Sequence, residues 1–73
     1  MWIYKSPIGD IIIERLTNGR YGMIYDSSVW EASHSPEAEA DNIYRQCTGC
    51  PDWDLYDTSN TDVPTDLSKW KKL

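Results

Sequence analysis

Three turn signals divide the first 34 residues into short segments that are rich in β-branched and aromatic side chains. Pro7 and Gly9 mark the first turn, Asn18-Gly19 the second and Asp26-Ser27-Ser28 the third. The segments between them have the composition of β-strands and cover residues 2–5, 11–16, 20–26 and 29–34. We therefore predict a three- or four-stranded antiparallel meander over residues 1–34.

A helix start signal follows the meander. Ser35 can cap free backbone amides, Pro36 fits the first helical position, and Glu37 meets the positive end of the helix dipole. Gly49 stands where a glycine commonly ends a helix. We predict a helix over residues 36–48.

The remaining chain, residues 49–73, is predicted to be an acidic loop that ends in a short helix. Pro51 prevents the first helix from continuing. The stretch 52–57 is interpreted as a strand or turn, and the terminal helix is expected at about residues 65–71 with Thr65 as its cap.

These elements predict an α+β fold in which one main helix packs on one face of the meander. At 73 residues the chain has room for a single small domain, residues 1–73. Large side chains must then supply the core, and the apolar stripe of the helix should face the sheet. The predicted core consists of Tyr4, Ile11, Ile13, Met23, Tyr25, Ile43, Tyr44 and Cys47, with Trp53 and Trp70 closing its edge.

The net charge of −5 is concentrated in the second half of the chain, because residues 31–66 carry nine acids against Arg45 alone. Such a field repels nucleic acid and anionic membranes, so we expect no direct binding to either. No apolar run reaches the roughly 20 residues of a membrane span. The N-terminus does not read as a secretory signal, and two cysteines fit a reducing compartment, so we expect a cytoplasmic protein.

Cys47 and Cys50 form a C-x-x-C pair with three interpretations. Redox catalysis needs a thiolate, which the C-terminal end of a helix and the neighbouring acids disfavour. Zinc needs about four ligands, and His34 is the only histidine available to join the pair. A plain helix end is the leading interpretation, and cysteine-centred redox or zinc chemistry is the alternative.

Acids alternate with aromatic residues after the helix, an arrangement that can form a docking strip for a partner. The candidates for this contact are Glu37, Asp41, Asp52, Trp53, Asp54, Tyr56 and Asp57. Neither a catalytic constellation nor a phosphate-binding motif is present, and we expect no enzyme activity and no cofactor. The leading hypothesis is a protein-binding module, such as a phage-type inhibitor or a regulator of a basic, nucleic-acid-handling partner. A homodimer formed through a sheet edge is a further alternative.

Two resemblances accompany this interpretation. The stretch YKSPIGDIIIE resembles the first hairpin in the N-terminal region of alkylguanine-DNA alkyltransferases, but the catalytic Pro-Cys-His-Arg motif of that family is absent. The order GRYGMIYD, SPEAEADNIY, TGCPDWD and PTDLSKW is similar to small bacterial proteins in which a strand meander precedes a SPEAAA-type helix. The second resemblance implies a fold and no site.

Overall fold

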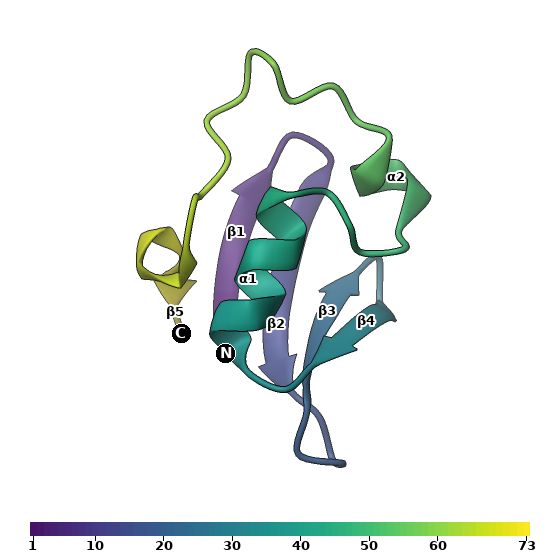
Figure 1. The fold of residues 1–73 in the computed structure, drawn as a ribbon, viewed down its shortest axis with the longest axis vertical. Coiled ribbons are helices and arrows are strands. Elements are labelled where there is room, and N and C mark those ends of the chain that lie inside the picture. The colour runs from purple at the N-terminus through teal and green to yellow at the C-terminus, as the bar shows by residue number, and fades with distance from the viewer.

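A computed structural model, which describes residues 1–73, shows a five-stranded antiparallel sheet with one main helix on it (Figure 1). The elements are β1 (Trp2–Ser6), β2 (Gly9–Arg15), β3 (Tyr21–Tyr25), β4 (Ser28–Ser33), α1 (Pro36–Tyr44), α2 (Pro51–Asp54), the 3-10 turn η1 (Leu67–Lys69) and β5 (Lys71–Lys72). The sheet order is β4-β3-β2-β1-β5. The predicted α+β meander is confirmed. None of the helices is long and apolar enough to cross a membrane.

The three predicted turns are all present, and residues with positive φ form the second and the third. In the second turn only Gly19 has a positive φ, +85°, and the Leu16 N–H bonds to the Arg20 carbonyl across a three-residue loop. The third turn is the two-residue loop Asp26-Ser27, where φ is 52° and 62°. Glycine and asparagine are preferred at such positions because a Cβ atom strains the left-handed conformation.

We expect Ser27→Gly to raise the free energy of unfolding by about 0.5–1 kcal/mol, because it removes this strain at one position. Ser28→Gly is the matched control, since residue 28 begins β4 and a glycine in a strand is expected to destabilise by a similar amount. Urea unfolding at constant m-value measures both changes. A loss of stability for Ser27→Gly would contradict the assignment of strain to this turn.

Helix α1 begins as predicted and ends earlier than predicted. The Ala38 N–H donates to Ser35 Oγ over 3.0 Å, which confirms the cap. The predicted end at residue 48 is wrong, because α1 stops at Tyr44. Gln46 adopts a φ of 55°, its N–H bonds to the Ile43 carbonyl, and the Cys47 N–H bonds to the Asn42 carbonyl. This pair of bonds is a Schellman motif, with glutamine at the position where glycine is usual.

The side chain of Gln46 explains why the helix ends there. Its Nε2 atom donates to the carbonyls of Trp53 and Tyr56, at 2.7 Å each, and its Oε1 accepts from Thr58 Oγ1 at 3.3 Å. These three bonds connect the end of α1 to α2 and to the segment that follows it. Gln46 therefore keeps a left-handed backbone conformation, which is usual for glycine, because its side chain bonds to residues that are distant in sequence.

Two predictions for the C-terminal third are wrong. The stretch 52–57 is neither strand nor turn at its start, because Pro51 occupies the first position of α2, where a proline needs no N–H partner. The bounds and the cap of the short helix expected at about residues 65–71 are also wrong, because it is the shorter 3-10 turn η1, capped by Asp66 rather than Thr65, and β5 follows it. Strand β5 pairs with β1, and hydrogen bonds of that ladder satisfy backbone groups that a helix would have satisfied internally.

The core lies between α1 and the sheet. Tyr44 and Cys47 were expected there, but both are exposed. Tyr44 is the last residue of α1, and Cys47 lies beyond the end of the helix. Cys50 is fully buried in their place. Tyr4 and Tyr25 are half-buried and pack against the core. The other predicted core residues are confirmed as buried: Ile11, Ile13, Met23, Ile43, Trp53 and Trp70.

Candidate functional site

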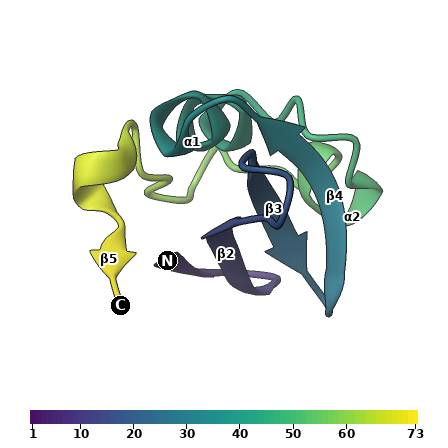
Figure 2. The same ribbon diagram turned by 90° about the horizontal axis from the view of Figure 1, so that it is seen from below.

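The sheet face away from α1 carries a row of apolar side chains that crosses four strands. Ile3 of β1 lies opposite Ile12 of β2, Ile12 lies opposite Ile24 of β3, and Ile24 lies opposite Val29 of β4. Lys71 extends the same row onto β5. Neighbouring residues in a strand point to opposite faces, so this row is on the other side of the sheet from the core isoleucines. Figure 2 shows α1 on one side of the sheet, with α2 at the edge formed by β4.

The row is partly open to solvent. Its three isoleucines are half-buried and belong neither to the core nor to the side chains packed against it, and the fourth member, Val29, is 54% exposed. The sequence held one signal for this face. Ile11, Ile12 and Ile13 are consecutive, and a strand with three consecutive apolar residues presents an apolar side chain to both faces.

A β-bulge aligns the last member of the row. Met23 pairs with Glu31 while Ile24 pairs with Val29, so Trp30 is the extra residue on β4. The Trp30 Nε1–H donates to the Tyr25 carbonyl over 3.0 Å, and its ring is 40% exposed. The bulge therefore changes the register by one residue and turns Val29 toward the helix-free face.

A groove with a volume of about 410 Å³ lies at one end of this face, between the first and third turns. Ile12 and Ile24 contribute apolar lining, while Asp10 of β2 and Asp26 of the third turn contribute carboxylates. The Tyr25 hydroxyl donates to the Ile8 carbonyl over 3.0 Å and so connects the two turns. The groove thus combines apolar lining with two carboxylates from separate loops.

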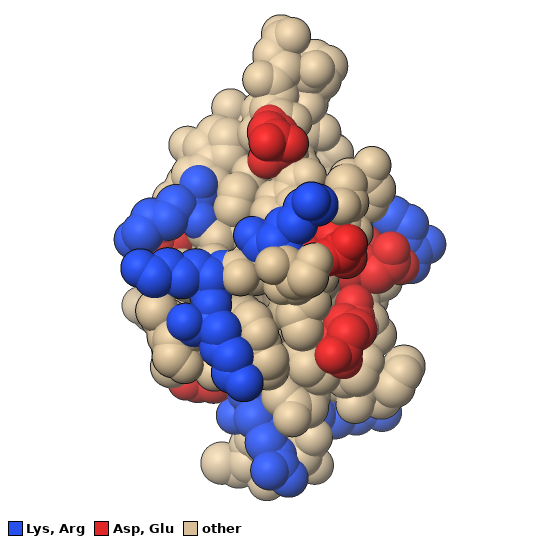
Figure 3. All heavy atoms as spheres, turned by 90° about the vertical axis from the view of Figure 1, so that its left-hand side faces the viewer, with Lys and Arg blue, Asp and Glu red and all other residues tan.

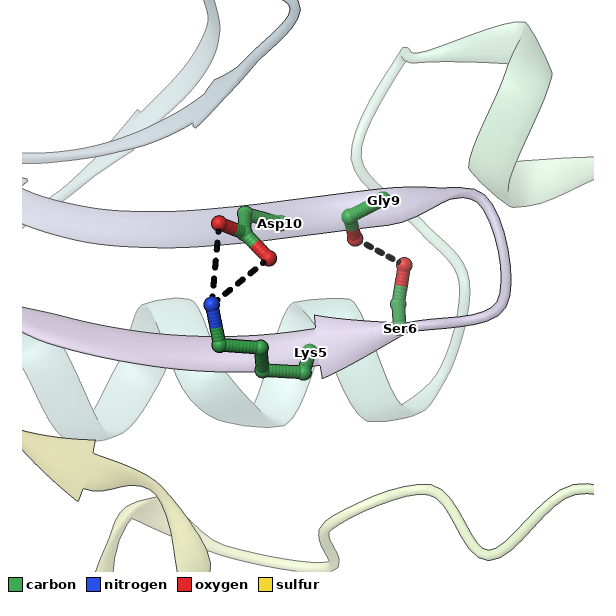
Figure 4. A network of polar contacts seen from close by, with 4 residues as sticks. All are labelled: Lys5, Ser6, Gly9 and Asp10. Carbon is green, nitrogen blue, oxygen red and sulfur yellow. Dashed lines mark hydrogen bonds and ion pairs between the residues drawn. The ribbon is translucent and has the colours of Figure 1, made fainter.

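Lys5 is the cation nearest to this groove along the sheet. Its Nζ lies 3.3 Å and 3.4 Å from the two carboxylate oxygens of Asp10, across the β1–β2 pair. In Figure 4 this contact stands in front of the two strands, with α1 behind them, and Ser6 donates to the Gly9 carbonyl at the turn. The two charged side chains are 75% and 48% exposed. An ion pair that is so exposed to solvent contributes little to stability.

Of the two aromatic residues in the predicted docking strip, Trp53 is buried and Tyr56 is exposed. Trp53 is fully buried, and its Nε1–H donates to the Ile43 carbonyl over 2.8 Å. It therefore cannot anchor a partner, which corrects its assignment as a contact residue. Tyr56 is stacked on Trp53 with a ring-centroid distance of 6.3 Å and is 36% exposed.

The predicted acidic contacts are divided between α1 and the segment around α2. Asp54 accepts hydrogen bonds from the N–H groups of Thr48 and Gly49 and from Thr48 Oγ1, and so holds the preceding turn. Asp57 accepts from the Ser59 N–H, which lowers the pKa of this carboxyl group. Glu37, Asp41 and Asp52 are exposed. These acids remain candidate contacts, but several of them already have partners within the chain.

One ion pair lies within this set. Asp41 and Arg45 stand four residues apart, and the carboxylate oxygen lies 3.0 Å from the Arg45 Nε. Both side chains are more than half exposed, so the pair is one of those that add only a few tenths of a kcal/mol, roughly 0.3–0.5, to a helix.

The two cysteines of the C-x-x-C pair differ in their exposure to solvent. Cys47 is exposed, whereas Cys50 is fully buried and directly precedes α2, and both are free thiols. Cys50 thus adjoins the start of a one-turn helix, rather than the end of a long one. His34 is exposed in the connection between β4 and α1. No group of three or more His, Cys, Asp or Glu side chains is arranged to hold a metal ion.

A pair of carboxyl groups that the sequence analysis missed lies between β4 and α1. Glu39 is fully buried; its Oε1 accepts a hydrogen bond from Ser33 Oγ over 3.0 Å, and Asn42 Nδ2 donates to the same hydroxyl over 3.3 Å. One oxygen of Glu31 and one of Glu39 are buried without another partner. Burial, followed by the hydrogen bond and charge of Glu31, raises the pKa of Glu39 to about 8. The Glu39 side chain therefore holds its proton at neutral pH.

The fold gathers the lysines on one side of the molecule. Strand β5 brings Lys71 and Lys72 beside β1, and Lys72 Nζ lies 5.3 Å from the centre of the Trp2 ring. Figure 3 shows Lys and Arg side chains as a band down this side, with acids clustered beside it. The net charge of −5 is thus unevenly distributed over the surface.

Comparisons with protein-family models, with curated proteins and with solved structures gave no match. Functional proposals for this chain therefore rest on its own geometry and chemistry.

Proposed function

We propose that the protein is a non-enzymatic binding module that holds a protein partner against the helix-free face of its sheet. The observation that carries this proposal is the row of Ile3, Ile12, Ile24 and Val29, which places apolar side chains directly opposite one another on a face without a helix. Protein interfaces typically have an apolar centre and a polar rim. Lys5, Asp10, Glu14 and Lys71 stand around the row as such a rim.

The partner is proposed to have a basic contact surface. The excess of acids over bases and the carboxylates of Asp10 and Asp26 at the groove support this choice. A cytoplasmic location fits two free thiols. A binding role also fits the placement of the most strongly perturbed acid, because Glu39 is fully enclosed and has no surface that a substrate could reach.

Differential capture from a cell lysate tests the proposal. Ile24→Lys is expected to reduce capture of the partner at least tenfold, because it places a charge in the centre of the apolar row. The matched control is Leu55→Lys, which adds the same charge at a residue that is 84% exposed and follows α2. Circular dichroism checks that both variants are folded. A partner retained equally by both variants would contradict a site on the helix-free face.

Sedimentation of the unmodified protein at two concentrations tests the alternative hypothesis that the protein is a homodimer. Strand β5 covers the outer edge of β1, whereas β4 leaves the other edge free and interrupted by the bulge. Bulges hinder edge-to-edge pairing of sheets. We expect a monomer mass at both concentrations, and a mass that doubles would favour the homodimer.

A further inference from the structure

We propose that the groove between the first and third turns receives a lysine or arginine side chain of the protein partner. This inference rests on the proposed function and adds the chemistry of one contact. The groove offers an apolar lining and two carboxylates in one place, which is the combination that a long cationic side chain requires.

The lining suits the aliphatic part of such a side chain. Ile12 and Ile24 are neighbours across β2 and β3, and both line the groove. A lysine or arginine stem laid on these two side chains would bury apolar surface on both partners. The stem would thereby continue the contact made by the apolar row, because Ile12 and Ile24 belong to both features.

The carboxylates of Asp10 and Asp26 suit the charged end of a lysine or arginine side chain. Asp26 has no cation partner within the chain, since the two ion pairs are Lys5–Asp10 and Asp41–Arg45. Its position at the tight third turn fixes its backbone. Burial, and then the charges of Asp52 and Asp26, raise the pKa of the Tyr25 hydroxyl, which also lines the groove. Several negative charges therefore act at this end of the sheet, and a cation entering the groove would be attracted to them.

Lys5 acts as an internal competitor in this arrangement. Its contact with Asp10 is exposed, so an incoming cation can displace it at small cost. Lys5→Met keeps a long unbranched side chain but removes the charge. We expect this variant to bind the cation about twofold to fivefold more tightly, because an exposed ion pair contributes up to about 1 kcal/mol.

The test is an NMR titration of the ¹⁵N-labelled full chain with the blocked tripeptide acetyl-Leu-Arg-Leu-amide. Its control ligand is the same peptide with citrulline, which keeps the shape of arginine without the charge. We expect saturable shifts at the amides of Gly9, Asp26 and Ser27, and binding at least fivefold weaker for the citrulline peptide. Asp26→Asn is expected to weaken binding of the arginine peptide about fivefold. Asp62→Asn makes the same change at an exposed loop residue that does not line the groove and is expected to have little effect.

Each other outcome overturns the inference. Equal affinity for the arginine and citrulline peptides would show that charge is not recognised. Equal losses in Asp26→Asn and Asp62→Asn would show only a general attraction to an acidic protein. Shifts that depend on protein concentration without peptide would show that a second copy occupies the face. If Ile24→Lys abolishes partner capture while the arginine peptide fails to bind, the binding module stands and the cation contact falls.

Discussion

Replacement of Glu39 by glutamine is expected to remove most of the dependence of stability on pH between about 5 and 8. Glutamine retains an oxygen that can accept the Ser33 hydrogen bond, and its amide can donate to the oxygen of Glu31 that has no other partner. The variant should therefore keep the fold while it loses the titrating group. At pH 8 it should be more stable than the unmodified chain.

The direction follows from the proton balance. The usual pKa of 4.5 applies to Glu39 in the unfolded chain, and its pKa in the folded chain is raised to about 8. Between these values the folded chain holds a proton that the unfolded chain has released. The contribution of this proton to the free energy of unfolding is therefore complete below pH 4.5 and is lost as the pH rises to about 8. The free energy of unfolding should fall by at most about 1.4 kcal/mol per pH unit in this interval.

Urea unfolding at pH 5, 6, 7 and 8 and at constant ionic strength measures this slope. Glu37→Gln is the matched control, since Glu37 is an exposed acid of the same helix, and it should retain the slope of the unmodified chain. If Glu39→Gln retained that slope as well, the raised pKa of Glu39 would be refuted.

Trp53→Ala is expected to cost about 3–5 kcal/mol, which is the usual range for removing a buried aromatic side chain. The ring of Trp53 is fully buried and packs edge to face on Tyr4, with a centroid distance of 6.1 Å. Its Nε1–H also satisfies the Ile43 carbonyl near the end of α1. For a domain of this size such a loss is comparable with the whole stability.

Thermal and urea unfolding of two further variants separate the contributions of the Trp53 hydrogen bond and of its burial. Trp53→Phe should cost less than the alanine variant, because it keeps most of the apolar contact and loses the hydrogen bond. Trp30→Ala removes the same side chain from a position that is 40% exposed and should cost less than half as much. Equal losses for Trp30→Ala and Trp53→Ala would contradict the burial that distinguishes these two residues.

Local signals were sufficient for the meander and for the start of α1. The turn residues at the three hairpins and the Ser35 cap act through neighbouring atoms, so their effect can be inferred from a short stretch of sequence. The structure agrees with the prediction at each of these positions.

Features that depend on distant contacts could not be predicted in this way. The helix ends at Tyr44 because Gln46 binds carbonyls of residues 53 and 56, and nothing near Gln46 in sequence indicates those acceptors. The exchange of burial between Cys47 and Cys50 follows from that early end. Likewise β5 forms because β1 offers it a free edge, whereas its lysines alone do not resemble a strand.

The candidate site is an intermediate case. Ile11-Ile12-Ile13 indicates that β2 is apolar on both faces, but the bulge at Trp30 decides whether Val29 or its neighbour completes the row. Asp10 and Asp26 stand sixteen residues apart in the chain and meet only because two hairpin turns lie at the same end of the sheet. Register and turn geometry therefore determine the site, and composition does not.

The hydrogen bond between the two ends of the chain has a mechanical consequence. The Leu73 N–H donates to the Met1 carbonyl over 2.9 Å, beside the pairing of Trp2 with Lys72, and Figure 1 shows both ends at one corner. A stretching force applied through the two ends would load this bond first and the next rung of the ladder only after it breaks. The β1–β5 contact would thus open like a zipper at low force, and the C-terminal segment would peel away while β1 to β4 remain paired.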